Sequence, residues 1–268
     1  MVVLDMEQRS ASRENGVASV RKALAILDLI AEDGPASLAE LGTKTALPKS
    51  TLFRLLSTMS DAGFIERAPG GDYALAVKLW RIGARAIDFA ALHPLIASAL
   101  RDLVDLTSET AHFSVYEGGN AVQVEKVECS HPIRAPTRIG GRSPGYASAT
   151  GKALLAYQPG DEIERVGGLA QRHTFATILD VDRLAQELAH VRQVGFAINR
   201  GEWRDGVWSV AAPVFDHRNQ VVGSMGVSGP QNRVEPGLEG IVRAVLGRAR
   251  TMTASLGGQP NRVYGTAA

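Results

Sequence analysis

The chain has 268 residues, enough for two modest domains, and 45% of them are hydrophobic, as in most globular proteins. A formal net charge of +1 gives no overall attraction to nucleic acid or membranes, and the single cysteine, Cys129, excludes a disulfide framework within one chain. No apolar run reaches the ~18 residues of a membrane span, and acids close to Met1 do not fit a signal peptide. We therefore expect a cytoplasmic protein with no membrane partner.

Residues 1–18 are polar and lack a hydrophobic period, so we expect a mobile N-terminal arm. Apolar residues then recur at helical spacing from Val20 to Ala31, and Gly34-Pro35 ends that pattern. This predicts the supporting first helix of a small domain over residues 19–75. Arg21 and Lys22, near the start of the helix, either meet a phosphate backbone or are simply solvated.

Two further helices are predicted in the same domain. Ser37 and Glu40 have the spacing of a capping box, and Pro48 suits the first turn of the following helix. In that second helix an apolar stripe points inward, formed by Leu52, Leu55, Leu56 and Met59. The opposite side of this short helix is mostly polar and carries cations. It is formed by Lys49, Ser50, Thr51, Phe53 and Arg54.

A small hairpin is predicted to follow, because Phe64–Arg67 leads through Gly70-Gly71 to Tyr73. Helix, tight turn, exposed helix and hairpin together predict a winged helix-turn-helix, with the exposed helix suited to a major groove of double-stranded DNA. The expected DNA contacts are Arg21, Lys22, Ser37, Lys49, Ser50, Thr51, Phe53, Arg54 and Arg67.

The charge of this domain does not by itself favour DNA. Residues 18–75 hold six Lys and Arg against seven Asp and Glu, one net negative charge. A DNA-binding role therefore requires the cations to lie on one surface, with affinity raised by several copies of the domain. The alternative is a winged helix that serves as a protein–protein module.

Residues 76–92 read as a linker helix that is apolar around much of its circumference, from Leu79 to Ala90. Such a helix needs a partner, either the same helix of a second subunit or the second domain of its own chain. We expect a homodimer formed through it, with His93-Pro94 ending the helix.

Residues 93–256 are predicted to form an α+β domain, in which an antiparallel sheet carries helices on its faces. We expect a hairpin over 112–127, a strand followed by a loop over 131–146, and three strands over 196–200, 207–215 and 221–228. The expected helices span 95–107, 148–157, 161–168, 180–194 and 236–256. Residues 257–268 should form a loose tail.

The segment from Gly145 to Lys152 superficially resembles a phosphate loop. Five residues rather than four separate Gly145 from Gly151, and Ala153 stands where Ser or Thr should bind magnesium, so an NTPase is not indicated. A flexible glycine-rich loop still leads into a helix start at Ser148. Free amides near Ala149 and Thr150 would favour a carboxylate there, although a plain capped helix is the alternative.

Small and hydroxyl side chains alternate on the last two strands. Ser224, Gly226 and Ser228 share one face by period two, and Ser209 lies similarly on the preceding strand. Together with the polar loop that starts at Asn199, they provide the space and directional hydrogen bonds that a small polar ligand needs. Tyr146 and Trp208 are candidates for an apolar wall of this site.

Catalysis is not indicated by the sequence. The six histidines have no metal-ligand spacing, and Cys129 with His131 is too slight a pair for a nucleophile or metal site. We expect no metal and no cofactor.

Three motifs carry a family resemblance that covers about residues 19–256: Leu47-Pro-Lys-Ser-Thr-Leu-Phe-Arg-Leu-Leu, Ala147-Ser-Ala-Thr-Gly-Lys-Ala-Leu-Leu-Ala, and Gly206-Val-Trp-Ser-Val-Ala-Ala-Pro-Val-Phe-Asp ending in Val227-Ser-Gly-Pro. The chain resembles IclR-type bacterial transcriptional regulators. The resemblance implies a winged helix, a linker helix and a GAF-like effector domain, in dimers that often pair into tetramers.

The resemblance also implies that a small organic acid binds the second domain and controls a catabolic operon. Its carboxylate-binding turn falls at Ala149 and Thr150, and the polar end of its pocket at Asn199, Ser209, Gly226 and Ser228. An acid often seen at 199 is Asn here, and a cysteine common at 209 is Ser. We therefore expect a DNA-binding regulator, a repressor rather than an activator. Its expected effector is a small carboxylate, for which both aliphatic and aromatic acids are candidates. The alternative is an enzyme acting on such an acid, with the winged helix as a tether.

Overall fold

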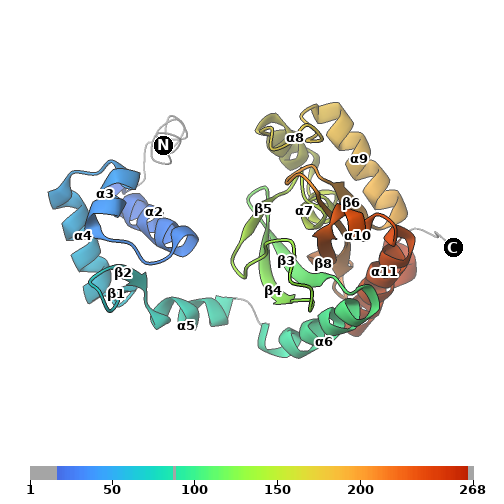
Figure 1. The fold of residues 1–268 in the computed structure, drawn as a ribbon, viewed down its shortest axis with the longest axis horizontal. Coiled ribbons are helices and arrows are strands. Elements are labelled where there is room, and N and C mark those ends of the chain that lie inside the picture. The colour runs from blue at the N-terminus through green and yellow to red at the C-terminus, as the bar shows by residue number, and fades with distance from the viewer. Residues whose placement is uncertain (1–16, 87–88, 265–268) are drawn as a thin grey trace. The chain divides into compact units, whose positions relative to one another are not determined.

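The computed structural model describes residues 17–86 and 89–264, and it divides into two compact units, Met1–Ala90 and Ala91–Ala268 (Figure 1). The expected N-terminal arm lies almost entirely outside the described residues. Each unit is described by itself below. Among the described helices, none combines the length and apolarity that crossing a bilayer requires.

The first unit is a winged helix-turn-helix, as predicted. It consists of α2 (Ala18–Asp33), α3 (Leu38–Thr45) and α4 (Lys49–Asp61), followed by an antiparallel wing of β1 (Ile65–Arg67) and β2 (Tyr73–Leu75). All five elements contribute buried side chains to one core, which includes Ile26, Ile30, Leu41, Leu52, Leu56, Ile65 and Tyr73. Burial of the apolar stripe of α4 in this core leaves its polar face outside.

Local capping fixes where these helices begin. The Ser37 hydroxyl accepts from the Glu40 amide at 3.3 Å and the Glu40 carboxylate accepts from the Ser37 amide at 2.8 Å, which confirms the capping box at the start of α3. Pro48 is the residue just before α4 rather than part of its first turn. Its fixed φ sets the chain direction there without costing the helix a hydrogen bond.

The linker helix expected over 76–92 falls on two described helices. The helix α5 spans Val77–Ala86, residues 87–88 lie outside the described residues, and α6 runs from Phe89 to Thr107 straight through Pro94. The prediction that His93-Pro94 ends a helix was therefore wrong. An interior proline costs about 3 kcal/mol, and the burial of Ile96, Leu100 and Leu103 further along α6 offsets that cost.

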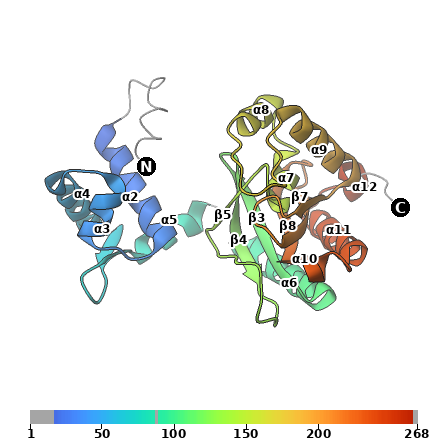
Figure 2. The same ribbon diagram turned by 45° about the horizontal axis from the view of Figure 1, so that its top comes forward.

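The second unit contains a six-stranded antiparallel sheet in the order β5-β4-β3-β8-β7-β6 (Figure 2). The strands β3 (Thr110–Glu117) and β4 (Asn120–Val127) form the predicted hairpin, and β7 (Val207–Phe215) and β8 (Val221–Pro230) form a second one. The edge strands are β5 (Arg142–Pro144) and β6 (Ala197–Arg200). Over 131–146 the order is a loop and then a short strand, the reverse of the prediction, since its Pro and Gly residues precede the strand.

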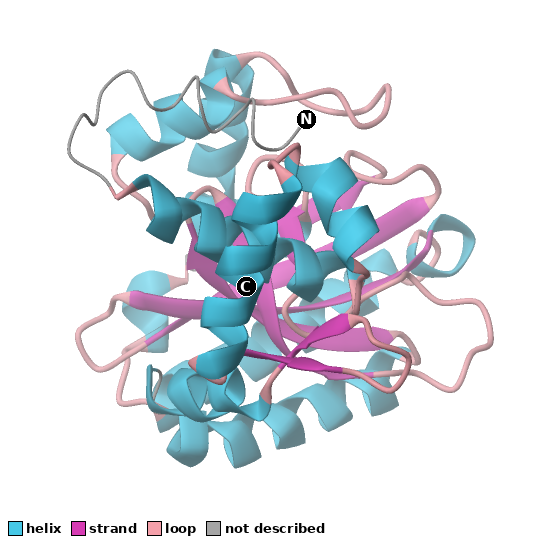
Figure 3. Cartoon of the chain, turned by 90° about the vertical axis from the view of Figure 1, so that its left-hand side faces the viewer, coloured by secondary structure: helices cyan, strands magenta, loops and turns pink. Residues whose placement is uncertain are grey.

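The connection from β5 to β6 crosses the sheet from one edge to the other. It contains α7 (Ala149–Leu155), α8 (Gly160–Gly168) and α9 (Val181–Val194), and α7 packs on the central strands. Helices cover both faces of the sheet (Figures 2 and 3). The helices α7, α8 and α9 lie on one face, and α6, α10 (Gln231–Val234) and α11 (Leu238–Ser255) lie on the other. The α+β fold with flanking helices is thus confirmed.

The segment after α11 is not loose as far as it is described. Its short helix α12 (Pro260–Val263) leads to Tyr264, whose ring is fully buried against Phe215. The Tyr264 hydroxyl lies 2.9 Å from the Thr253 hydroxyl and donates to the Pro213 carbonyl. The buried Tyr264 ring therefore holds this segment against the sheet. The turn-forming composition of the segment gave no indication of this contact. Residues 265–268 lie outside the described residues.

Candidate nucleic-acid interface and effector pocket

The N-terminal half of α4 presents an exposed cationic surface. Lys49, Ser50, Phe53 and Arg54 are all exposed, and 53% of the Phe53 surface remains accessible. The single acid of α4, Asp61, is its last residue, so nothing within the helix neutralises these cations. Thr51 is half-buried in a groove that α4 forms with the start of α2.

The other expected DNA contacts lie in different settings. Arg21 is exposed and Lys22 is half-buried on α2. The hydroxyl of Ser37 is engaged by Glu40 at 2.8 Å. Arg67 holds the wing, because its guanidinium donates to the Tyr73 hydroxyl at 2.6 Å and to the Gly71 carbonyl while stacking over the Tyr73 ring. In this unit, Ser37 and Arg67 therefore already have internal structural roles.

In the second unit three polar residues line up across neighbouring strands. Asn199 of β6 pairs directly with Ser209 of β7, and Ser209 pairs with Ser228 of β8. Directly paired residues in an antiparallel sheet point to the same face, and the side chains of these three are all buried. The same face meets α7, since the Ser224 hydroxyl donates to the Thr150 carbonyl at 3.2 Å.

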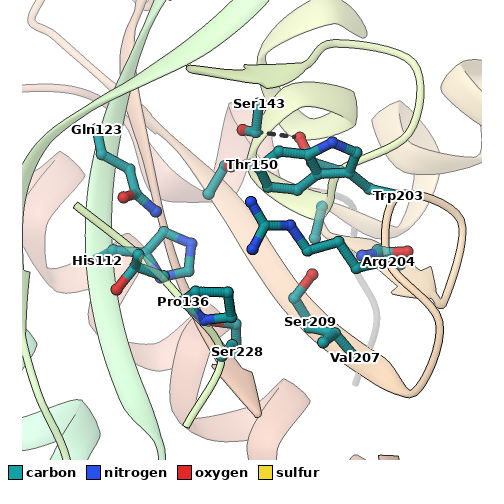
Figure 4. Close-up of a pocket in the computed structure, with 15 residues that line it drawn as sticks. His112, Gln123, Pro136, Ser143, Thr150, Trp203, Arg204, Val207, Ser209 and Ser228 are labelled. Atoms are coloured by element: carbon teal, nitrogen blue, oxygen red, sulfur yellow. Dashed lines mark hydrogen bonds between the residues drawn. The ribbon is translucent and has the colours of Figure 1, made fainter. Parts of the chain in front are cut away.

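The start of α7 closes one side of this polar row. Ser148 caps the helix by accepting from the Gly151 amide at 3.1 Å, so Ala149 and Thr150 supply the remaining first-turn amides. Gly151 permits this packing, because a Cβ there would lie 2.5 Å from the Pro144 carbonyl oxygen. Ala149 and Thr150 both line the resulting pocket, and Figure 4 shows Thr150 at its wall.

The pocket has fifteen lining residues and about 410 Å³ of empty space, including its open mouth. Five of the residues predicted to bind an effector line it, namely Ala149, Thr150, Asn199, Ser209 and Ser228. None of the fifteen is Asp or Glu, and Arg204 is their only Lys or Arg. The pocket is therefore rich in hydrogen-bond donors and suits an anion.

Arg204 and Trp203 come from the loop after β6. The Arg204 guanidinium lies 4.4 Å from the Trp203 ring centre and forms no ion pair within the described part of the chain. Threonines secure the loop, because the Thr177 hydroxyl donates to the Glu202 carbonyl at 2.7 Å and the Thr174 hydroxyl to the Gly201 carbonyl at 2.7 Å. Figure 4 shows the guanidinium reaching into the pocket.

The same loop fixes the orientation of Asn199. Its Oδ1 accepts a hydrogen bond from the Glu202 amide at 2.7 Å. The amide Nδ2, a donor, is therefore the Asn199 group left for a ligand. A carboxylate at this position would have repelled an anion, whereas the asparagine presents a donor to it.

Three predicted effector residues do not line the pocket. Tyr146 is packed elsewhere, with its hydroxyl 2.9 Å from His173 Nε2 and its ring stacked on that imidazole. Trp208 points to the other face of β7 from Ser209 and lies beside Arg200, so it does not line this pocket. Gly226 lies in β8 opposite His112, where it adds no side chain.

Sequence reasoning did not identify the other ten lining residues as ligand contacts. They are His112, Gln123, Ala135, Pro136, Thr137, Ser143, Ser148, Trp203, Arg204 and Val207. Period-two alternation could have placed His112 and Gln123 on the hairpin. The loop residues 135–137 and Arg204 carry no periodic signal, and only the tertiary fold brings them to the site.

Comparison with known proteins places the whole chain in one family. The family model for the bacterial transcriptional regulator IclR C-terminal domain matches residues 85–254, and that for the IclR helix-turn-helix domain matches residues 19–69. The transcriptional regulator KdgR of Escherichia coli is 32% identical over 247 residues, which cover 91% of this chain and 94% of that protein. The chain belongs to the IclR family of transcriptional regulators.

Other similar proteins and solved structures are also IclR-type regulators. The transcriptional repressor IclR of E. coli is 29% identical over 250 residues, covering 90% of this chain and 91% of that protein. The crystal structure of an IclR regulator from Silicibacter sp. matches with a TM-score of 0.78 and 26% identity, over 93% of this chain and all of that chain. An IclR homolog from Microbacterium hydrocarbonoxydans, solved with 4-hydroxybenzoate, has the same fold, with a TM-score of 0.75 and 23% identity over 89% of this chain and all of that chain.

These relatives are named as regulators and repressors, which supports a DNA-binding transcriptional regulator and not the alternative of an enzyme. The described residues also contain no group of three His, Cys, Asp or Glu side chains that could hold a metal ion.

Proposed function

We propose that the protein represses a catabolic operon and that a small carboxylic acid, bound in the second unit, controls its affinity for DNA. The observation that carries this proposal is the pocket itself. Its lining combines one arginine, the donor of Asn199 and several hydroxyls with no carboxylate. The names of two relatives, a transcriptional repressor and an acetate operon repressor, support repression.

DNA binding is assigned to the exposed face of α4. Lys49, Ser50 and Arg54 would contact phosphates or base edges, and the exposed Phe53 ring would pack on a sugar or a thymine methyl. Thr51, Arg21 and Lys22 would contribute at the margin of this face. Ser37 and Arg67 would act mainly by holding α3 and the wing in shape.

The effector's carboxylate is assigned to the end of the pocket near Arg204 and α7. Arg204, Asn199 and Ser209 all line the pocket, and the first-turn amides of Ala149 and Thr150 would add partial positive charge. The family member solved with 4-hydroxybenzoate indicates that this fold accommodates an aromatic acid.

We further propose a homodimer formed through α5, which pairs into a tetramer. On α5 the large apolar side chains of Val77, Trp80 and Ile82 are exposed, with 74% of the Trp80 surface accessible. Large exposed apolar side chains are typical of subunit contacts. A dimer would present two α4 helices to half-sites about 34 Å apart.

Calorimetry tests the assignment of the effector. Acetate, butyrate, benzoate and 4-hydroxybenzoate would each be titrated into the full-length protein alongside their methyl esters. We expect at least one acid to bind stoichiometrically, without turnover, and its ester to bind at least about tenfold more weakly. Binding of esters as tight as that of acids, or undiminished acid binding after Ser228→Leu, would contradict the pocket assignment.

A further inference from the structure

We propose that Lys78 sets the angle between α5 and the DNA-reading helix α4, and that it thereby determines which spacing of operator half-sites a dimer of this protein accepts. The inference rests on the proposed dimer through α5. It assigns part of the specificity for the operator to a residue outside the DNA-contacting face of α4.

The first observation is that Lys78 joins the start of α5 to the end of α4. Its Nζ donates to the Ala62 carbonyl at 2.6 Å, and Ala62 is the residue that caps α4. The lysine stem lies against Gly63, where an added Cβ would be 3.6 Å from Lys78 Cδ. The ammonium also lies 4.5 Å from the centre of the Phe64 ring. One side chain therefore contacts three consecutive residues at the end of α4.

The second observation concerns charge at this end of α4. The last carbonyls of a helix carry partial negative charge, which a nearby cation stabilises. The helix α4 has no basic residue in its last turn and ends with Asp61, so it does not supply that cation itself. The Lys78 ammonium does so from α5, and the Phe64 ring adds a cation–π contact. Lys78 is half-buried in this position, so its side chain has a defined place.

The third observation is how α5 is attached to the rest of its unit. Just before α5, the Ala76 amide donates to the Phe64 carbonyl at 3.0 Å. Further along α5, Trp80, Arg81 and Ile82 are exposed. The backbone hydrogen bond at Ala76 is one point about which the helix can swing. The contact of Lys78 with the end of α4 adds a second point, and two points fix the direction of α5.

The size of the effect follows from the length of the helix. With 10 residues, α5 is about 15 Å long. A swing of about 15° over that length moves one end by about 4 Å, which is comparable to the rise of about 3.4 Å between base pairs. A dimer gains affinity from its second α4 only when both helices reach their half-sites at once. A loosened α5 would therefore let the dimer accept other spacings.

The chain offers a matched control. Lys44 is another lysine of the same unit, and its ammonium is paired with Asp33 at 3.0 Å on the surface. Its contact joins α3 to α2 and does not involve α5. Changing Lys44 to Met removes the same group from the same unit without touching the attachment of α5.

The test measures operator affinity by fluorescence anisotropy with the full-length protein. The operator would be selected from random-sequence duplexes, and its spacer between half-sites then shortened or lengthened by one base pair. A duplex with a single half-site would be measured as well. For the parent we expect each change of spacer to weaken binding at least about tenfold.

Lys78→Met should reduce this penalty to less than about threefold while leaving affinity for the single half-site unchanged, because only the second contact depends on the angle of α5. Lys78→Arg should keep the penalty, since a guanidinium can donate to the same carbonyl and stack on the same ring. Lys44→Met should also keep it. Thermal unfolding and light scattering would show that each variant is folded and has the mass of the parent.

The outcomes separate this inference from the proposed function. If the parent binds its operator but tolerates every spacer, or if Lys78→Met keeps the full penalty, the role of Lys78 is refuted and the regulator stands. An equal loss of affinity by Lys78→Met for all duplexes, the single half-site included, would reduce the residue to a stabilising one and also refute it. If the parent selects no duplex, or is a monomer, the proposed function itself fails.

Discussion

Lys152 Nζ lies 2.7 Å from Glu202 Oε1, although the two side chains are only 1% and 9% exposed. The ammonium also meets Glu187 at 2.9 Å. This pair joins α7, which supplies the pocket amides, to the loop that carries Trp203 and Arg204. Burial raises the pKa of the Glu202 carboxyl, and the Lys152 ammonium opposes that rise. The ion pair therefore determines how the two walls of the pocket face each other.

Lys152→Met should destabilise the protein, because it leaves the Glu202 carboxyl buried without its cation. Loss of one partner of a buried pair costs about 3–5 kcal/mol. Chemical denaturation would measure this loss, and the acid affinity should fall as the loop carrying Arg204 loosens. The double variant Lys152→Met with Glu202→Leu should recover part of the stability, because the buried Glu202 charge is gone and only the partly exposed Glu187 carboxylate loses its partner. A single variant as stable as the parent would show that the pair is not needed.

The buried imidazole of His112 makes stability depend on pH. Its pKa is about 4 in the folded protein against 6.5 for an ordinary histidine, so between these values the unfolded chain binds a proton that the folded chain does not. Stability therefore falls as pH drops from 6.5 to 4, by about 3 kcal/mol at most from this group. His112→Gln should lose less stability over this interval. Parallel denaturant-stability profiles for the two proteins would contradict the assignment.

Arg54→Ala should weaken operator binding by about 1–3 kcal/mol if the guanidinium reads a base. The operator would first be selected from random-sequence duplexes, and affinity measured by fluorescence anisotropy. Lys44→Ala is the matched control, since Lys44 is exposed on α3 and already paired with Asp33 at 3.0 Å. Equal affinities for the Arg54 variant and the parent would remove α4 from the DNA interface.

Trp80→Glu should shift the protein toward smaller species, because it places a charge on the exposed apolar side of α5. Light scattering at micromolar concentration would report the mass of the parent, which we expect to be a dimer or tetramer. Ala39→Glu, which adds the same charge at an exposed position of α3, should leave that mass unchanged. A monomeric parent protein would refute the dimer proposal outright.

Hydrophobic periodicity and capping residues predicted most of the helices and strands, because both are patterns within a single element. The alternation of Ser224, Gly226 and Ser228 with buried Met225 and Val227 gave the correct faces of β8. Capping residues Ser37, Ser148 and Asp180 stand directly before α3, α7 and α9. These signals are local, so one sequence is enough to find them.

The features that the sequence did not predict depend on contacts between residues far apart in the chain. Pro94 stays within α6 because burial along that helix outweighs a lost hydrogen bond, and Tyr264 anchors a segment whose composition favours turns. Five of the fifteen residues that line the pocket were named from the sequence, and three of them, Asn199, Ser209 and Ser228, lie on strands that follow a period of two. Arg204 and His112 were missed, because the connection between opposite sheet edges decides that they meet.

The central claim is that a small carboxylate in this pocket controls DNA binding. A ligand can do so only by binding one arrangement of the protein better than another. The most direct test is operator affinity, measured by anisotropy with and without the acid that binds most tightly, for the parent protein and Arg204→Gln. We expect the acid to weaken operator binding by the parent at least about fivefold, and its methyl ester to have no effect. The Arg204 variant should bind the operator normally but no longer respond. A full response in that variant, or an equal response to the ester, would contradict the claim.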